Sequence, residues 1–113
     1  MKYEVKIHPG AMEDIRRNSQ WWAENHSETQ ALAWYEHAIA SLARLEQLPS
    51  RHSLSVENND FPYEIRDLLF GLGPQPSYRA VFTIVENTVH LLTIQRSSQD
   101  TLRAADVAFD PDE

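Results

Sequence analysis

Two strands can be recognised directly in YRAVFTIVENTVHLLTIQR, residues 78–96. The two halves of this stretch, 78–85 and 89–95, are rich in β-branched and aromatic residues, which favour strands. Between them stands Glu86-Asn87, a polar pair that suits a tight hairpin turn. The stretch therefore predicts two antiparallel strands joined by a short turn.

The residues before this hairpin predict two more strands and two helices. Alternation of apolar and polar residues indicates strands at 2–7 and 63–70. Apolar residues spaced by three or four indicate helices at 10–25 and 27–48, and Pro49 ends the second. The order β-α-α-β-β-β predicts an α+β fold, in which an antiparallel sheet carries a two-helix hairpin on one face.

The second helix has the clearest signals. Ser27-Glu28-Thr29-Gln30 has the form of a capping box, with a hydroxyl at the N-cap and an amide three residues later. An apolar stripe follows, formed by Leu32, Tyr35, Ala38, Ile39, Leu42, Leu45 and Leu48. We expect the two helices to pack antiparallel. We also expect Leu32, Tyr35, Ile39 and Leu42 to be buried against Phe82, Ile84 and Leu91.

Length and charge limit the class of protein. With 113 residues, 42% of them hydrophobic, and no cysteine, the chain has the composition of one globular domain without disulfides. Its net charge of −7 argues against broad nucleic-acid binding. We expect a single domain at 1–103 and, at 104–113, a mobile or weakly docked acidic tail. The acidic residues of this tail are Asp106, Asp110, Asp112 and Glu113.

Signals for export, membranes, metals and cofactors are not found in the sequence. The first six residues carry charges where a signal peptide has an apolar run, and no segment is apolar enough to span a membrane. The five histidines lack the spacing of a metal site, and Gly71-Leu72-Gly73 lacks the third glycine of a dinucleotide loop. We expect a cytoplasmic protein that uses no metal and no cofactor.

The hairpin also predicts where arginines gather. An even-numbered turn gives the pairs Val85 with Thr88, Thr83 with His90, Val81 with Leu92 and Arg79 with Ile94. Alternation then brings Arg79 and Arg96 to one end of the sheet face away from the helices, and Arg66 joins them if the register allows. Three converging guanidiniums suit an anion, either phosphate or carboxylate. The alternative is that each arginine forms a cross-strand ion pair with Glu64, Asp67 or Glu86.

Seven short stretches, in this order, carry a wider likeness that covers residues 3 to 103. They are Tyr3-Glu4-Val5-Lys6-Ile7, Glu13-Asp14-Ile15, Ala33-Trp34-Tyr35, Leu45-Glu46-Gln47-Leu48-Pro49, Ile65-Arg66-Asp67-Leu68-Leu69-Phe70-Gly71, Tyr78-Arg79-Ala80-Val81-Phe82 and Val89-His90-Leu91-Leu92-Thr93-Ile94-Gln95-Arg96. Together they resemble the RelE/ParE superfamily, the bacterial toxins of type II toxin–antitoxin pairs. The long helical hairpin with its tryptophan is more similar to the ParE branch, often called plasmid stabilization proteins.

The resemblance implies different activities for the two branches. ParE-like members inhibit DNA gyrase. RelE-like members are ribosome-dependent endoribonucleases that cleave messenger RNA without a metal, using Arg and Lys side chains with a Tyr, His or Glu as acid or base. For a ribonuclease, the resemblance would assign the catalytic role to Arg66, Arg79 and Arg96.

Two departures from the ribonuclease pattern favour the ParE branch. Glu64 stands where those enzymes have a second basic residue, and Arg96-Ser97-Ser98-Gln99-Asp100 contains neither histidine nor tyrosine. We therefore expect a ParE-like toxin that inhibits growth by binding a target such as DNA gyrase and is neutralised by a cognate antitoxin. The alternatives are a RelE-like ribonuclease acting on ribosome-bound messenger RNA, and a degenerate member that only binds its antitoxin.

Overall fold

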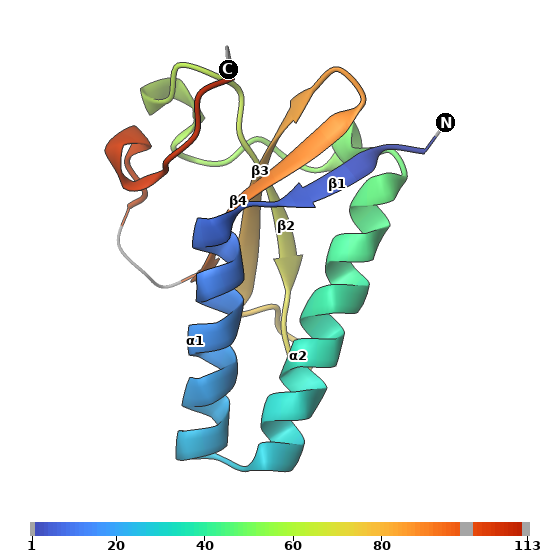
Figure 1. Ribbon diagram of the computed structural model, residues 1–113, viewed down its shortest axis with the longest axis vertical. Helices are drawn as coiled ribbons and strands as arrows, with labels where there is room; N and C mark the ends of the chain where they lie inside the picture. The colour runs from blue at the N-terminus through green and yellow to red at the C-terminus, as the bar shows by residue number, and fades with distance from the viewer. Residues whose placement is uncertain (1, 98–100, 112–113) are drawn as a thin grey trace.

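The structure, a computed structural model, describes residues 2–97 and 101–111 (Figure 1). Its strands and long helices follow the predicted order and confirm the α+β class. They are β1 (Glu4–Ile7), α1 (Pro9–Asn25), α2 (Glu28–Ala43), β2 (Arg66–Phe70), β3 (Tyr78–Val85) and β4 (Thr88–Arg96). In the described part of the chain, no helix has the length and apolar character that crossing a membrane requires.

The strands form one sheet in the order β1-β4-β3-β2. β2, β3 and β4 are antiparallel as predicted, but β1 runs parallel to β4, with Val5 beside Val89 and Ile7 beside Leu91. The sheet is therefore mixed and not wholly antiparallel. The alternation within β1 determines which of its residues face the core. It does not determine whether β1 runs parallel or antiparallel to β4, which is distant in the chain.

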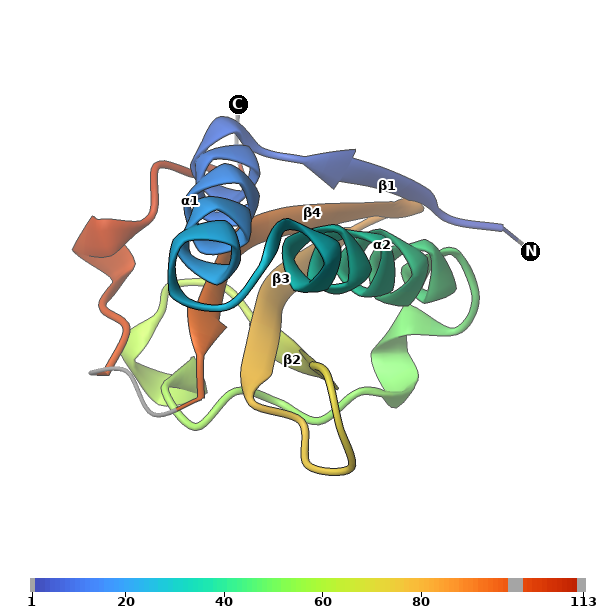
Figure 2. The same ribbon diagram turned by 90° about the horizontal axis from the view of Figure 1, so that it is seen from below.

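The two helices form an antiparallel hairpin that covers one face of the sheet, as predicted (Figure 2). The core between the helices and the sheet is apolar, and Trp34, Phe82 and Leu91 are fully buried in it. Ser27 caps α2 as the sequence predicts, because its side chain accepts a hydrogen bond from the Gln30 amide at 3.1 Å.

The face of α2 that meets the sheet differs from the predicted stripe. Leu42 is buried, but Leu32, Tyr35 and Ile39 are 58%, 44% and 38% exposed. The residues buried in their place each precede them by one position, and these are Ala31, Trp34 and Ala38. One position is a rotation of about 100° about the helix axis. The small alanines allow close packing on the sheet, and the Trp34 indole fills the remaining space.

A β-bulge changes the register of the hairpin. Between the turn and the bulge the pairs are as predicted, and Thr83 faces His90. A register shift between Val81 and Phe82 then moves the partners by one position, so that the next pairs are Val81 with Thr93, Ala80 with Ile94, Arg79 with Gln95 and Tyr78 with Arg96. The predicted pairs Val81 with Leu92 and Arg79 with Ile94 are therefore wrong. An extra residue in one strand has this effect, because it reverses the alternation beyond it.

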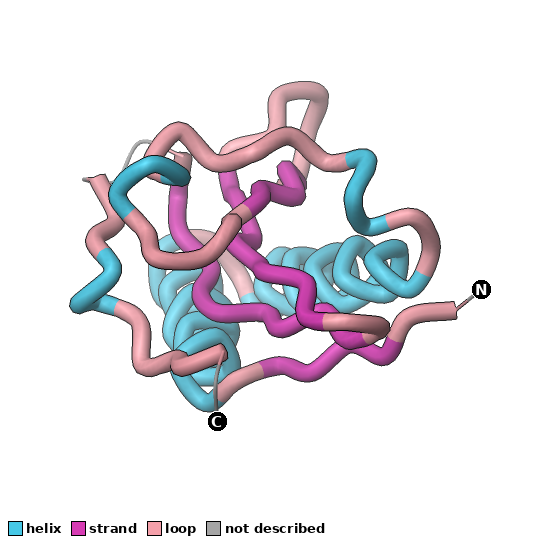
Figure 3. Tube along the Cα trace, turned by 90° about the horizontal axis from the view of Figure 1, so that it is seen from above, coloured by secondary structure: helices cyan, strands magenta, loops and turns pink. Residues whose placement is uncertain are grey.

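A second, smaller apolar cluster lies on the face away from the helices. Its buried members are Phe61, Ile65, Val81, Leu92 and Leu102. Tyr63, from the irregular chain before β2, and Val107 and Phe109, from the C-terminal segment, pack against this cluster. Figure 3 traces the backbone of both segments beside the strands. The described part of the tail therefore contacts the sheet, and its mobility stays a prediction. Asp112 and Glu113 of that tail lie outside the described residues.

Candidate functional site

Arg79, on β3, lies in a buried ion-pair cluster on the face away from the helices. Its two terminal nitrogens, Nη1 and Nη2, donate to the two carboxylate oxygens of Glu57 at 2.7 and 2.6 Å. Nη2 also donates to Gln95 Oε1 at 2.9 Å, and Asp67 lies 3.4 Å from Nη1. The Arg79 and Glu57 residues are only 7% and 3% exposed. This arrangement is a bidentate clamp, which we call the Arg79 clamp.

The clamp fixes the charges of its members. The hydrogen bond from Arg79 lowers the pKa of Glu57 to about 2, and the backbone amide of Leu102, which donates to Glu57 at 3.0 Å, adds to this effect. The same hydrogen bond raises the pKa of Arg79. Asp67 in turn accepts a hydrogen bond from the Ser55 hydroxyl at 2.5 Å. The charge of Arg79 is therefore matched by carboxylates of its own chain.

Arg66, on β2, is held by the chain that precedes it. Its guanidinium donates to the backbone carbonyl of His52 at 2.6 Å and to the carboxylate of Glu64 at 2.8 Å. Arg66 faces Phe82 across the β2–β3 pair. By alternation along the strand, Arg66 and Arg79 therefore lie on opposite faces of the sheet.

Arg96, at the end of β4, contacts α1. Its guanidinium carbon lies 4.0 Å from the ring centre of Trp21, a cation–π contact. Because Arg96 pairs with Tyr78 in the helix-side core, it lies on the same face as the helices. Ser98, Gln99 and Asp100, which the sequence analysis searched for an acid or base, lie outside the described residues.

The three arginines therefore do not converge on one face. Arg66 and Arg96 share the helix side of the sheet, but their partners on β3, Phe82 and Tyr78, are separated by about 13 Å along the strand. Part of the alternative expectation is seen, since Arg79 pairs with Asp67 across β2 and β3, and Arg66 pairs with Glu64, which precedes it on the same stretch of chain. The main partner of Arg79, Glu57, was not anticipated. It lies in the irregular chain before β2, where no periodicity indicates which side chain turns inward.

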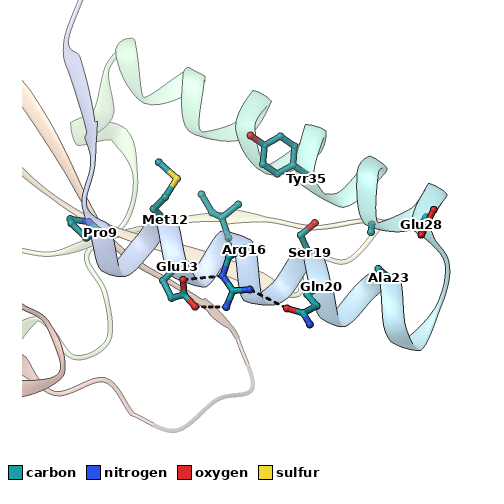
Figure 4. A pocket seen from close by; sticks show the side chains of 11 residues that line it. Pro9, Met12, Glu13, Arg16, Ser19, Gln20, Ala23, Glu28 and Tyr35 are labelled. Atoms are coloured by element: carbon teal, nitrogen blue, oxygen red, sulfur yellow. Dashed lines mark hydrogen bonds and ion pairs between the residues drawn. The ribbon is translucent and has the colours of Figure 1, made fainter.

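The described surface also holds an apolar groove between α1 and α2, with a volume of about 760 Å³. Met12 of α1 and Tyr35 of α2 point toward each other across it (Figure 4). Both side chains are substantially exposed, at 53% and 44%. Leu32 and Ile39 lie on the same exposed face of α2 and are also exposed. The apolar spacing along α2 does not reveal this surface, because the same spacing is expected of residues in the core.

Charged side chains line one side of this α1–α2 groove. Arg16 donates to Glu13 at 3.0 Å and to Gln20 at 3.1 Å, along the exposed face of α1 (Figure 4). Over residues 9–44 the two helices carry five acidic and three basic side chains, so their surface is acidic on balance. An apolar floor with a charged rim is typical of a surface that binds an amphipathic helix of a partner.

No group of three or more His, Asp or Glu side chains in residues 2–97 and 101–111 is arranged to hold a metal ion. What the described residues offer is thus an arginine clamp closed by its own carboxylates and an open apolar groove. In the first, Arg79 is paired with carboxylates of its own chain, and the second offers an exposed apolar contact surface.

A mixed sheet with a parallel β1–β4 pair and a helical hairpin on one face is the architecture of the RelE/ParE class of fold. No protein-family profile and no curated protein matches the chain. Among solved structures, the chain is similar to one described as the chromosomal ParDE TA system from P. aeruginosa, with a TM-score of 0.67 and 16% sequence identity. The match covers 84% of this chain and 96% of that chain. This chain has the RelE/ParE-like fold that its sequence predicts.

Proposed function

We propose that this protein is the toxin of a type II toxin–antitoxin pair, of the ParE kind. It inhibits growth by binding a cellular target such as DNA gyrase, and a cognate antitoxin neutralises it. The observation that carries the proposal is the fold shared with the ParDE structure over most of both chains. The seven RelE/ParE-like sequence stretches between Tyr3 and Arg96 also support it.

The Arg79 clamp favours target binding over RNA cleavage. Cleavage without a metal needs cations that meet the charge developing on the phosphate. The guanidinium of Arg79 is already occupied by Glu57 and by Gln95. Removing it from the clamp would leave a buried carboxylate unpaired, which costs about 3–5 kcal/mol. The guanidiniums of Arg66 and Arg96 are engaged by different partners, Arg66 by His52 and Glu64, and Arg96 by the Trp21 ring.

We propose that the antitoxin binds in the α1–α2 groove. The exposed Met12, Leu32, Tyr35 and Ile39 offer apolar contacts at helical spacing on two neighbouring helices. The acidic balance of these helices suits a partner segment with basic flanks. An amphipathic helix of the antitoxin, with an apolar stripe and lysine or arginine beside it, fits both features. A cytoplasmic location and a role in plasmid stabilization follow from the same assignment.

The proposal is tested by inducing the chain without its antitoxin in a bacterial host. Growth, transcript integrity by primer extension, and gyrase-linked DNA breaks are scored together. We expect growth arrest with intact transcripts and with DNA breaks. Codon-phased cleavage of messenger RNA would instead establish the ribonuclease, provided that it disappears in the double variant Glu57→Gln/Arg79→Gln. Soluble expression without arrest would identify a degenerate antitoxin-binding member.

The groove is tested with a candidate antitoxin, taken as a small DNA-binding protein if the genome encodes one beside this gene. Tyr35→Asp should keep growth arrest but abolish rescue by that protein, because a charge enters the apolar contact. The control is Leu48→Asp, which adds the same charge at a residue that is 65% exposed and does not line the groove. Equal rescue of both variants would show that the antitoxin binds elsewhere.

A further inference from the structure

A second exposed apolar surface lies at the other side of the molecule, beside β2. Leu54, Val56 and Leu69 are 46%, 92% and 53% exposed. They line one depression, with a volume of about 480 Å³, which shares no lining residue with the α1–α2 groove. We call it the β2-edge surface. Strand periodicity does not reveal this surface, because it assigns Leu69 to a strand without showing which strand lies beside it.

Two arginines lie at this surface in a protein whose net charge is −7. Arg44 and Arg51 line the depression, and both side chains are exposed. His52 also lines it, and its pKa is lowered by burial and then by the positive charges of Arg51, Arg44 and Arg66. The one acidic lining residue, Asp67, is bound to Ser55 and Arg79. The exposed charges of the β2-edge surface are therefore those of two arginines, in a chain whose net charge is negative.

The chain reaches this arrangement through a strained turn. Leu48 has φ 46° and ψ 53°, the left-handed conformation that non-glycine residues rarely adopt. This turn separates the two short 3-10 turns Arg44–Glu46 and Pro49–Arg51. Both arginines consequently line the same depression although seven positions separate them. Backbone strain of this kind is concentrated at functional surfaces in proteins.

The backbone of β2 is open at this surface. β2 is the edge strand, and its outer side is covered at first by residues 53–55, through Ser55 N–H to Ile65 O and Asp67 N–H to Ser53 O. Outward-facing backbone groups recur at every second residue, so Leu69 is the next position to face outward. No hydrogen bond from outside the β2–β3 pair reaches the Leu69 backbone from the described residues. An extended peptide can pair there.

We propose that the β2-edge surface binds an acidic, extended segment of a partner protein, which pairs with Leu69 and fills the depression with apolar side chains. The positive rim selects acidic residues in that segment, and the exposed Leu54 and Val56 select apolar residues that alternate with them. This proposal stands apart from the proposed function. The toxin assignment concerns growth arrest and the α1–α2 groove, whereas this one concerns a separate surface with its own direct binding test.

The probe is a short synthetic peptide that alternates valine with glutamate, titrated into the full-length, isotope-labelled protein. We expect saturable shifts of the Leu54, Val56 and Leu69 amides, with no change at Tyr35 in the other groove. A peptide that alternates valine with lysine should not produce them. Equal binding of the two peptides, or an absence of saturable shifts at β2, would overturn the proposal.

Reversing the charges at the rim of the β2-edge surface tests the electrostatic part of the proposal. Arg44→Glu/Arg51→Glu should weaken binding of the acidic peptide by about tenfold or more, since two favourable ion contacts become repulsive. The control Lys2→Glu/Lys6→Glu makes the same change in net charge beside β1, at the opposite edge of the sheet, and should leave binding unchanged. Equal weakening by both double variants would show a general charge effect and reject the site.

Further measurements test the apolar contact and the other molecules that could occupy the surface. Val56→Ser should weaken peptide binding several-fold without changing the unfolding midpoint, because this side chain is 92% exposed. If the protein instead self-associates and Leu69→Glu abolishes that association in sedimentation, the surface belongs to a second copy of the chain. Tighter binding of a single-stranded oligonucleotide than of the acidic peptide would likewise reject the proposal.

Discussion

The two faces of the sheet are stabilised by different interactions. The helix face is a dry apolar core, in which Trp34 packs on the rings of Phe70 and Tyr78 with ring centres 6.1 and 5.2 Å away. The opposite face combines a smaller apolar cluster with the buried Arg79 clamp, under irregular chain and the C-terminal segment. Apolar packing tolerates rearrangement of its members, whereas a buried ion pair fails when either member is lost. The difference predicts how each face responds to substitution and to acid.

The largest single effect is expected on the helix face. Trp34→Ala should lower the free energy of unfolding by about 3–5 kcal/mol, because a large and fully buried side chain is removed. Tyr35→Ala, one position later, should change it by less than about 1 kcal/mol, because that side chain is 44% exposed. Urea unfolding measures both. Similar losses in the two variants would mean that α2 presents the originally predicted stripe to the sheet.

On the opposite face, the loss should depend on leaving a charge unpaired. Arg79→Gln should lower the free energy of unfolding by about 3 kcal/mol, since the Glu57 carboxylate remains buried without its partner. The double variant Glu57→Gln/Arg79→Gln should recover most of this loss. Denaturant unfolding of the wild type, both single variants and the double variant gives the coupling free energy. A double variant as unstable as Arg79→Gln would contradict this account.

The Arg79 clamp also predicts that the protein loses stability at acidic pH. The pKa of Glu57 is about 2 in the folded chain and 4.5 ordinarily, so below pH 4.5 the unfolded chain takes up a proton that the folded chain does not. Stability from this group is complete above pH 4.5 and is lost as the pH falls toward 2. Thermal unfolding across this range should show a weaker pH dependence in Glu57→Gln/Arg79→Gln than in the wild type.

A histidine pair predicts a smaller effect at milder pH. His8 Nε2 and His90 Nδ1 are 2.8 Å apart, and Phe109 packs against both rings. Burial lowers the pKa of both histidines below 6.5, with Lys6 adding to the effect. The unfolded chain therefore binds more protons below pH 6.5, and stability falls as the pH decreases through that value. His90→Gln should reduce this dependence between pH 7 and pH 5, as measured by urea unfolding. An unchanged slope would show that the pair does not cause it.

The smallest expected loss of stability concerns the N-cap of α2, a local feature. Ser27→Ala should lower the free energy of unfolding by about 1 kcal/mol, because the Gln30 amide loses its acceptor at the start of α2. Ser27→Asp is the control, since an aspartate can also cap the helix and should retain most of the stability. A loss of comparable size in both variants would show that the hydroxyl contributes through some other contact.

The sequence by itself determined the order and type of the elements, because these depend on neighbouring residues. The β-branched and aromatic residues of 78–85 and 89–95 were enough to predict the hairpin, and the turn at Glu86-Asn87 set its register as far as Phe82 with Leu91. Ser27 marked the start of α2 in the same way, but α2 ends at Ala43 and not at Leu48, and Pro49 begins a short 3-10 turn. The resemblance to the RelE/ParE superfamily depended on this order, and the fold agrees with it.

Only the tertiary structure decided which faces meet. Four features depend on contacts between distant parts of the chain. They are the parallel direction of β1, the rotation of α2 by one residue, the bulge that separates Arg79 from Arg96, and the ion pair of Glu57 with Arg79. Each depends on the packing volume or the charge of residues far away in sequence, which short-range periodicity does not contain. The candidate site changed accordingly, from three converging arginines to a closed clamp and an open groove.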